Sequence, residues 1–124
     1  MCQTTARLVE VVLFVVAQTN LQFFNQMRAQ NRPESDYGVI RAAYDLACLL
    51  YSGYYQADGK PFISHSVGVA STLSHLGLPA PIVALGLLHN IYGNGNFGDG
   101  RIYRVTPERQ RRVRDAVGEE VETL

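Results

Sequence analysis

The chain has 124 residues, of which 47% are apolar and 18% are charged, a composition typical of one ordinary globular domain. Eleven Lys and Arg residues balance eleven Asp and Glu residues, so a general electrostatic attraction to nucleic acid or to an anionic membrane is not expected. Two cysteines do not make a disulfide framework, and we therefore expect a reducing, cytoplasmic location.

The first predicted element is a hydrophobic helix over about residues 5–30. Its longest apolar run, residues 11–17, is shorter than the about 20 residues that cross a membrane. The run also lacks the basic start and the cleavage site of a signal peptide. Because a helix that is apolar all round is usually buried on more than one side, we expect it to pack on the domain, on a second copy in a homo-oligomer, or on both.

Helical periodicity continues along the rest of the chain, and no stretch alternates with the period of a strand. Further helices are predicted over about residues 35–53, 65–76, 80–92 and 106–118, and residues 119–124 are interpreted as the first turn of another. The connecting loops include residues 54–64 and the glycine-rich residues 93–100. We expect an all-α bundle in which residues 1–34 form the N-terminal helix and linker and residues 35–124 form the helical domain.

Two of the three histidines are candidates for a binding site. His65 lies where a loop enters the third predicted helix, and His89 shares an apolar helix face with Ile82 and Leu85. Neutral imidazole is the commonest protein ligand for transition metals, so two such groups from different helices would make half of a metal site. The alternative is that each is a core histidine bonded to a neighbour. His75, near a helix end, is expected to be structural or solvated.

Several spaced segments resemble a known family. Ala-Tyr-Asp-Leu-Ala at 43–47, Gly-Lys-Pro-Phe-Ile-Ser-His at 59–65 and Leu-Leu-His at 87–89 are similar to the hydrolase domain of RelA/SpoT-type enzymes, which belong to the HD superfamily of metal-dependent phosphohydrolases. The two histidines are 24 residues apart, as in that family, and residues 115–121 resemble a further family segment. The resemblance covers about residues 37–124 and implies an HD-domain-like helical bundle with an extra N-terminal helix.

The resemblance also implies a metal site formed by His65, His89 and the residue after it. That residue is Asn90, where the superfamily has aspartate, and the family's next acidic pair falls on Gly93 and Asn94. Its final aspartate lies beyond the end of this sequence, so the HD-type domain is expected to be incomplete at its C-terminus. Two imidazoles and one neutral amide leave the charge of a manganese, iron or zinc ion uncompensated.

Other residues could contribute to the site. Asp99, in the glycine-rich loop, is the candidate for a catalytic acid or base, although glycines oppose rigid positioning. Tyr51, Tyr55 and Gln56 lie near the expected pocket and could bind a ligand, with the tyrosines stacking on a ring or merely packing. The arginines of residues 109–114 either bind phosphate or form a solvated face paired to acidic neighbours.

Three hypotheses for the function remain open. The first is a degenerate, non-catalytic HD-type domain that binds a small, phosphorylated ligand or a partner through the former active-site pocket. The second is a divergent metal-dependent phosphohydrolase that acts on a nucleotide or another phosphoester. The third is a fragment whose missing part supplies the last ligand. Neither nucleic acid nor a membrane is expected as a partner.

Overall fold

The computed structural model describes residues 15–52, 59, 61–99 and 105–124. Within these ranges every regular element is a helix and no β-strand occurs, which confirms the all-α class. The helices, in chain order, are α2 (Asn20–Ala29), α3 (Glu34–Tyr51), α4 (Phe62–His75), α5 (Ala80–Leu88), α6 (Ile91–Asn94), α7 (Pro107–Val117) and α8 (Glu119–Glu122).

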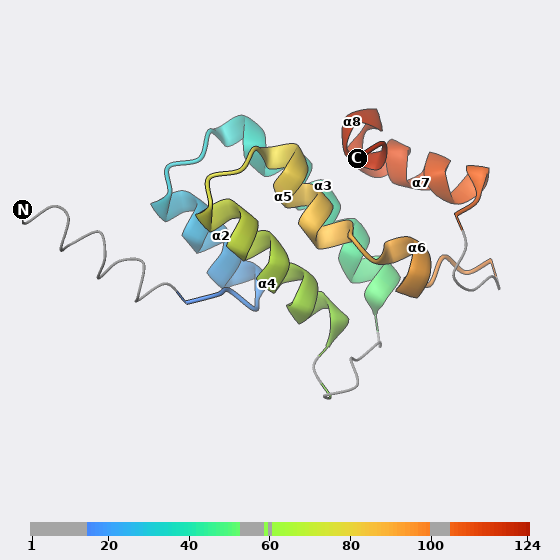
Figure 1. The fold of residues 1–124 in the computed structure, drawn as a ribbon, viewed down its shortest axis with the longest axis horizontal. Coiled ribbons are helices and arrows are strands. Elements are labelled where there is room, and N and C mark those ends of the chain that lie inside the picture. Colours follow the sequence, from blue (N-terminus) through green and yellow to red (C-terminus); the bar gives the residue numbers. More distant parts are fainter. Residues whose placement is uncertain (1–14, 53–58, 60, 100–104) are drawn as a thin grey trace, which may run out of the picture.

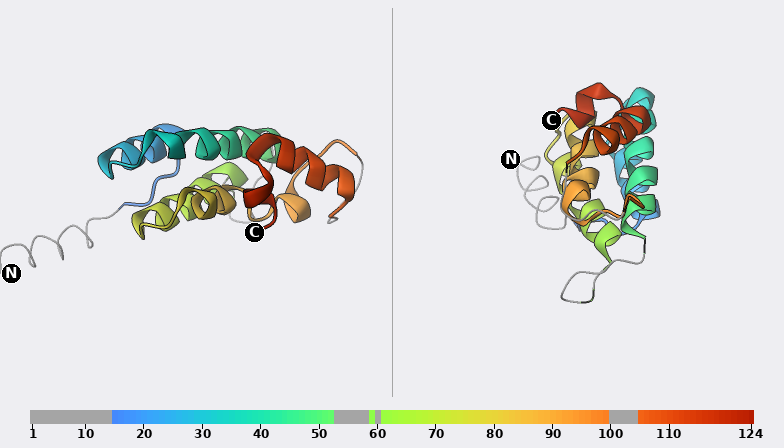
Figure 2. Two further views of the ribbon diagram at one scale, coloured as in Figure 1. Left: turned by 90° about the horizontal axis from the view of Figure 1, so that it is seen from above. Right: turned by 90° about the vertical axis from the view of Figure 1, so that its right-hand side faces the viewer.

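The helices form two layers that are closed at one end. Helices α2 and α3 make one layer and α4 and α5 make the other, with α7 and α8 packed at the end remote from α2 (Figures 1 and 2). Helix α5 carries no polar side chain and contacts α3, α4 and α8. An apolar helix of this kind is stable only when neighbours cover much of it. The core between the layers includes the fully buried Phe23, Met27, Ile40, Leu50 and Leu87.

The N-terminal part differs from the expected single helix over residues 5–30. Residues 15–18 are not helical, and α2 begins only at Asn20, because the Thr19 side chain accepts a hydrogen bond from the backbone N–H of Gln22 and caps the new helix. Residues 1–14, which hold the rest of the predicted hydrophobic helix, lie outside the described residues. Helix α2 nevertheless contributes Phe23 and Met27 to the core.

Polar side chains join α2 to α4 beside these apolar contacts. The Ser71 hydroxyl donates to Gln26 Oε1, and the Ser74 hydroxyl donates to Gln30 Oε1. Arg32, at the corner between α2 and α3, donates to the Ser74 hydroxyl and to the Leu78 carbonyl, and its guanidinium pairs with Asp36 at 3.1 Å. Because the Arg32 side chain is nearly buried, its hydrogen bonds hold the corner between α2 and α3 against the end of α4.

The sequence predicts the ends of one helix correctly and misses the end of another. Thr106 caps α7 and Gly118, with φ +92°, ends it, as expected. The predicted helix over residues 80–92 instead breaks after Leu88, and the chain turns at His89 and Asn90 before the short α6. No helix in the described part of the chain is long and apolar enough to cross a membrane.

Candidate functional site

The two candidate histidines lie at helix ends that face each other. Helix α4 begins at Phe62, three residues earlier than predicted, so His65 lies in its first turn. His89 is the C-cap of α5, and Asn90 is the N-cap of α6. The site is therefore built where α4 starts and α5 stops.

The structure brings His65 and His89 together from these two helices. Their ring centroids are 5.3 Å apart and the ring planes are inclined at 55°. His65 is half-buried and His89 is exposed, so the pair lies at the surface of the bundle. The 24-residue spacing thus corresponds to a real juxtaposition of two imidazoles.

A close approach between α4 and α5 makes this juxtaposition possible. A Cβ atom on Gly86 would lie 2.7 Å from Leu73 Cδ1, 3.2 Å from Ala70 Cα and 3.3 Å from Ala70 N, so a larger residue there would force the Leu73 side chain to move and α4 to shift by a few tenths of an ångström. The Gly86 carbonyl also lies 2.8 Å from His89 Nδ1. Because a carbonyl can only accept, Nδ1 carries a hydrogen and Nε2 is left as the outward-facing nitrogen. Sequence reasoning overlooked Gly86, although a glycine inside an apolar helix is itself a signal of tight packing.

Asn90 occupies the place that the resemblance gives to a metal-bridging aspartate. It is half-buried, and its side chain makes no capping hydrogen bond to α6. Within the described ranges, no group of three His, Cys, Asp or Glu side chains could hold an ion. Two imidazoles and an amide, the donors that the described residues bring together here, lack the anionic ligand that a catalytic divalent metal needs for charge balance.

The structure places Asp99 on an arginine rather than beside the histidines. Its two carboxylate oxygens accept from Arg109 Nε and Nη2 at 2.8 and 2.7 Å, a bidentate ion pair. Arg109 is only 2% exposed, and the Asp99 carboxylate raises the pKa of its guanidinium against the opposite effect of burial. Asp99 thus has a structural partner that sequence spacing could not identify.

The arginines of α7 are not one uniform solvated face. The Arg109 guanidinium lies 4.4 Å from the centre of the Phe97 ring, and Arg112 donates to the Phe97 carbonyl at 2.9 Å. Phe97 also stacks on Tyr92 with centroids 6.0 Å apart. The alternative of a solvated face is therefore wrong for Arg109, which is buried and pairs with Asp99 of the glycine-rich loop.

Of the residues expected to line a ligand pocket, only Tyr51 is described; Tyr55 and Gln56 lie outside the described residues. Tyr51 ends α3, is 2% exposed and stacks on Phe62 with ring centroids 5.7 Å apart. Burial raises the pKa of its hydroxyl to about 12, although the Asn90 backbone and Ser66 oppose the rise. The tyrosine ring is part of the core rather than an exposed stacking surface.

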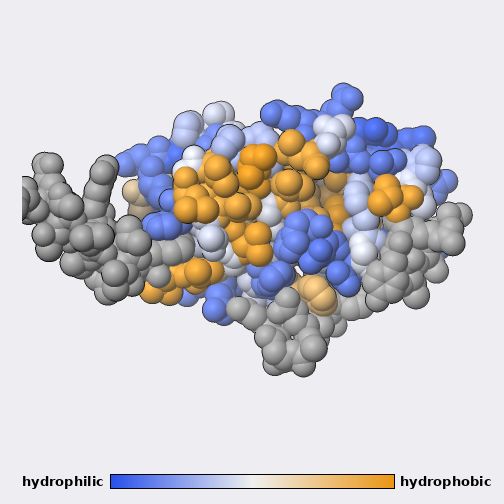
Figure 3. Space-filling view, viewed as in Figure 1, coloured by the Kyte–Doolittle hydropathy of each residue, from blue (hydrophilic) through white to orange (hydrophobic). Residues whose placement is uncertain are grey.

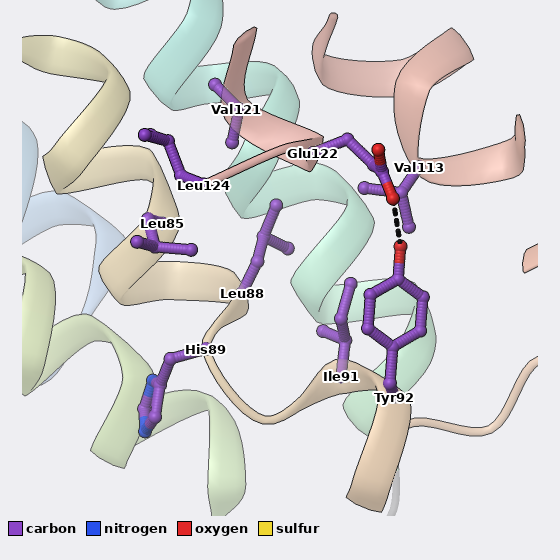
Figure 4. A pocket seen from close by; sticks show the side chains of 9 residues that line it. All are labelled: Leu85, Leu88, His89, Ile91, Tyr92, Val113, Val121, Glu122 and Leu124. Carbon is purple, nitrogen blue, oxygen red and sulfur yellow. Dashed lines mark hydrogen bonds between the residues drawn. The ribbon is translucent and has the colours of Figure 1, made fainter. Parts of the chain in front are cut away.

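An apolar groove of about 200 Å³ lies on the other side of the α5 end (Figure 4). His89 also lines the groove, but its ring points toward α4, away from the other lining side chains, so His89 is shared between the groove and the histidine pair. At its edge the Tyr92 hydroxyl donates to Glu122 at 3.0 Å, and burial together with this carboxylate raises the pKa of Tyr92. The other lining residues are Leu85, Leu88, Ile91, Val113, Val121 and Leu124.

Comparisons with known proteins give one family and several partial relatives. Residues 50–124 match the model of the family described as a domain of unknown function, DUF6817. The bifunctional (p)ppGpp synthase/hydrolase RelA of Mycobacterium tuberculosis is 29% identical over 58 residues, which is 47% of this chain and 8% of that protein. The GTP pyrophosphokinase of Myxococcus xanthus is 31% identical over 62 residues, 50% of this chain and 8% of that protein. The similarity thus covers less than a tenth of either relative.

Proposed function

The chain belongs to the DUF6817 family, and we propose that it is a non-catalytic HD-type domain that binds a small phosphorylated ligand between His65 and His89. The observation that carries the proposal is the approach of the two imidazole rings to 5.3 Å at the surface, with no acidic group completing a metal site among the described residues. The partial relatives support the ligand class, since their names refer to GTP and (p)ppGpp, both phosphorylated molecules.

The chemistry of the pair suits a phosphate group. His89 Nδ1 already donates to Gly86, so Nε2 meets the ligand, accepting a hydrogen bond when neutral and donating one when protonated. A phosphate monoanion offers both a hydroxyl and acceptor oxygens, and it therefore matches either state of the imidazole.

The proposal is tested by histidine NMR on metal-free protein titrated with inorganic phosphate. We expect the signals of His65 and His89 to move with one common Kd of about 1 mM, a free energy that a few hydrogen bonds supply. His75 is exposed near the other end of α4 and is the internal control, because its signal should stay in place. His89→Ala should abolish the response of His65. Equal movement of all three signals, or none, would contradict the proposal.

The alternative is a divergent metal-dependent phosphohydrolase, which the spacing of the two histidines favours. An ion bound about 2.0–2.1 Å from each imidazole nitrogen would bridge them, but it would still need an anionic ligand. Elemental mass spectrometry on protein purified without chelator separates the two functions. Near-stoichiometric manganese, iron or zinc that is lost in His89→Ala would support the hydrolase, and Asn90→Asp should then bind the ion more tightly.

A further inference from the structure

Tyr51 carries a buried hydroxyl for which the structure provides no hydrogen-bond partner within the described residues. The side chain ends α3 and is 2% exposed, and its ring stacks on Phe62 with the planes inclined by only 17°. The stacked ring fixes the direction of the hydroxyl. A buried tyrosine hydroxyl normally finds a partner, so this exception needs an explanation.

The surroundings of the hydroxyl connect it to the histidine pair. The Ser66 side chain and the Asn90 backbone lie near enough to lower the pKa of Tyr51, which is the effect of groups that donate toward the phenol oxygen, so the proton of the hydroxyl still lacks an acceptor among the described residues. Ser66 directly follows His65 on α4, and Asn90 directly follows His89 at the end of α5. The hydroxyl therefore lies beside the residues that directly follow the two histidines in the sequence.

The protonation state of Tyr51 makes it a donor. Burial raises its pKa to about 12, so the hydroxyl keeps its proton throughout the neutral range. Folding removes this hydroxyl from water, and the described part of the protein supplies no hydrogen-bond acceptor for its proton in exchange. The unpaired hydroxyl therefore lowers the stability of the fold. A buried polar group that stays unpaired in a native structure therefore calls for an explanation, such as a partner supplied by a ligand, a water or an ion.

We propose that Tyr51 is the inner hydrogen-bond donor of the site and binds a phosphate oxygen of the ligand that His65 and His89 hold from outside. This inference rests on the proposed function and deepens it, because it gives the site a third, uncharged donor that comes from a third helix. The site then selects groups that accept a hydrogen bond at their inner end.

The test compares Tyr51→Phe with wild type in two measurements. The substitution keeps the ring and its stacking on Phe62 and removes only the hydroxyl. Without phosphate, the variant should melt about 3–5 °C higher, because an unpaired buried group has been removed. In the histidine NMR titration its Kd for inorganic phosphate should rise about tenfold, the loss expected for one hydrogen bond to a charged acceptor. A rise in stability with a loss of affinity is not expected of a purely structural residue.

Tyr44→Phe is the matched control. Tyr44 also lies on α3 and has a pKa raised to about 12 by burial and by Cys48, but it is only half-buried and does not carry an unpaired buried hydroxyl. Its substitution should leave the phosphate Kd unchanged and should not raise the melting temperature. In the wild-type protein, the hydroxyl proton of Tyr51 should also move downfield when phosphate is added, a readout that does not depend on any variant.

The outcomes separate the two proposals. If wild type shows the histidine response and Tyr51→Phe binds phosphate equally well, the inference about Tyr51 is overturned and the proposed function stands. If the variant melts lower with unchanged affinity, the hydroxyl is structural and the inference is again overturned. If phosphate moves neither His65 nor His89 in wild type, the proposed function fails, and the role of Tyr51 fails with it.

Discussion

Asp99 shows how far the chemistry of a single residue depends on its partner. In sequence it is the only acid of the glycine-rich loop and is therefore a candidate acid or base. In the structure its carboxylate is held by Arg109, which also lies over Phe97 and donates to the Tyr92 carbonyl at 3.3 Å. Arg109 follows Asp99 by ten positions and comes from another element, so no local pattern predicts the pair.

We predict that Asp99→Asn destabilises the fold by about 2–3 kcal/mol, because it leaves the buried Arg109 without its counter-charge. Asp45→Asn is the control: the Arg41–Asp45 pair is one helical turn apart, and both side chains are more than 60% exposed. Its loss should change stability by about 0.5 kcal/mol or less. Urea unfolding with unchanged m-values measures both changes. Equal effects of the two variants would show that the Arg109 pair is no stronger than a surface pair.

At the scale of elements, the helices were predictable from local signals, but their contacts were not. Thr106 before Pro107 and Gly118 after α7 are local end signals, and the predicted bounds agree with the structure. Thr19 is also a local cap, yet the strong apolar run before it favoured one continuous helix. The approach of His65 to His89 depends on how α4 and α5 pack, which no single-helix pattern contains. For the site, the resemblance identified the pair, while the roles of Gly86 and Tyr51 required the packed structure.

Gly86 provides the test at this scale. We predict that Gly86→Ala destabilises the protein by about 1–2 kcal/mol, because a Cβ 3.2 Å from Ala70 Cα forces α4 and α5 apart by more than helix propensity compensates. The same shift should weaken phosphate binding by separating the histidines. Gly38→Ala is the matched control, since α3 leaves open space around Gly38, and it should stabilise by about 0.5–1 kcal/mol. Thermal unfolding and the NMR titration report the two effects. Normal phosphate affinity in Gly86→Ala would show that this contact does not position the pair.

Several apolar side chains lie on the surface of the molecule instead of in its core. Figure 3 shows apolar side chains gathered over the face formed by α4 and α5. These helices contribute the partly exposed apolar residues Leu73, Ile82 and Leu85, and Leu76, at the C-cap of α4, is 66% exposed. Near the N-terminus of the chain, Val15 is 81% exposed, and in the sequence it follows the apolar residues 11–14. Surfaces of this kind commonly mark contacts between proteins.

We predict that the protein self-associates through the apolar residues 11–15. Sedimentation velocity should show a species larger than a monomer that increases with concentration, and the double variant Val12→Ser/Val15→Ser should shift the distribution toward monomer. Leu49→Ser, which changes a 60% exposed apolar residue on α3, is the control and should leave the distribution unchanged. A monomer at all concentrations for wild type would contradict the prediction.

The polar contacts between α2 and α4 have one more consequence, which concerns alignment rather than affinity. Phe23 and Met27 bury apolar surface between the helices. Because apolar contacts are non-directional, they alone would let α2 shift along α4 at little cost in free energy. Gln26 meets Ser71 and Gln30 meets Ser74, four and three positions apart on the two helices. A slip of one residue would break both bonds and leave the buried Ser71 and Ser74 hydroxyls without these partners. These two hydrogen-bonded pairs therefore fix a single register between α2 and α4. The apolar contacts alone would allow others.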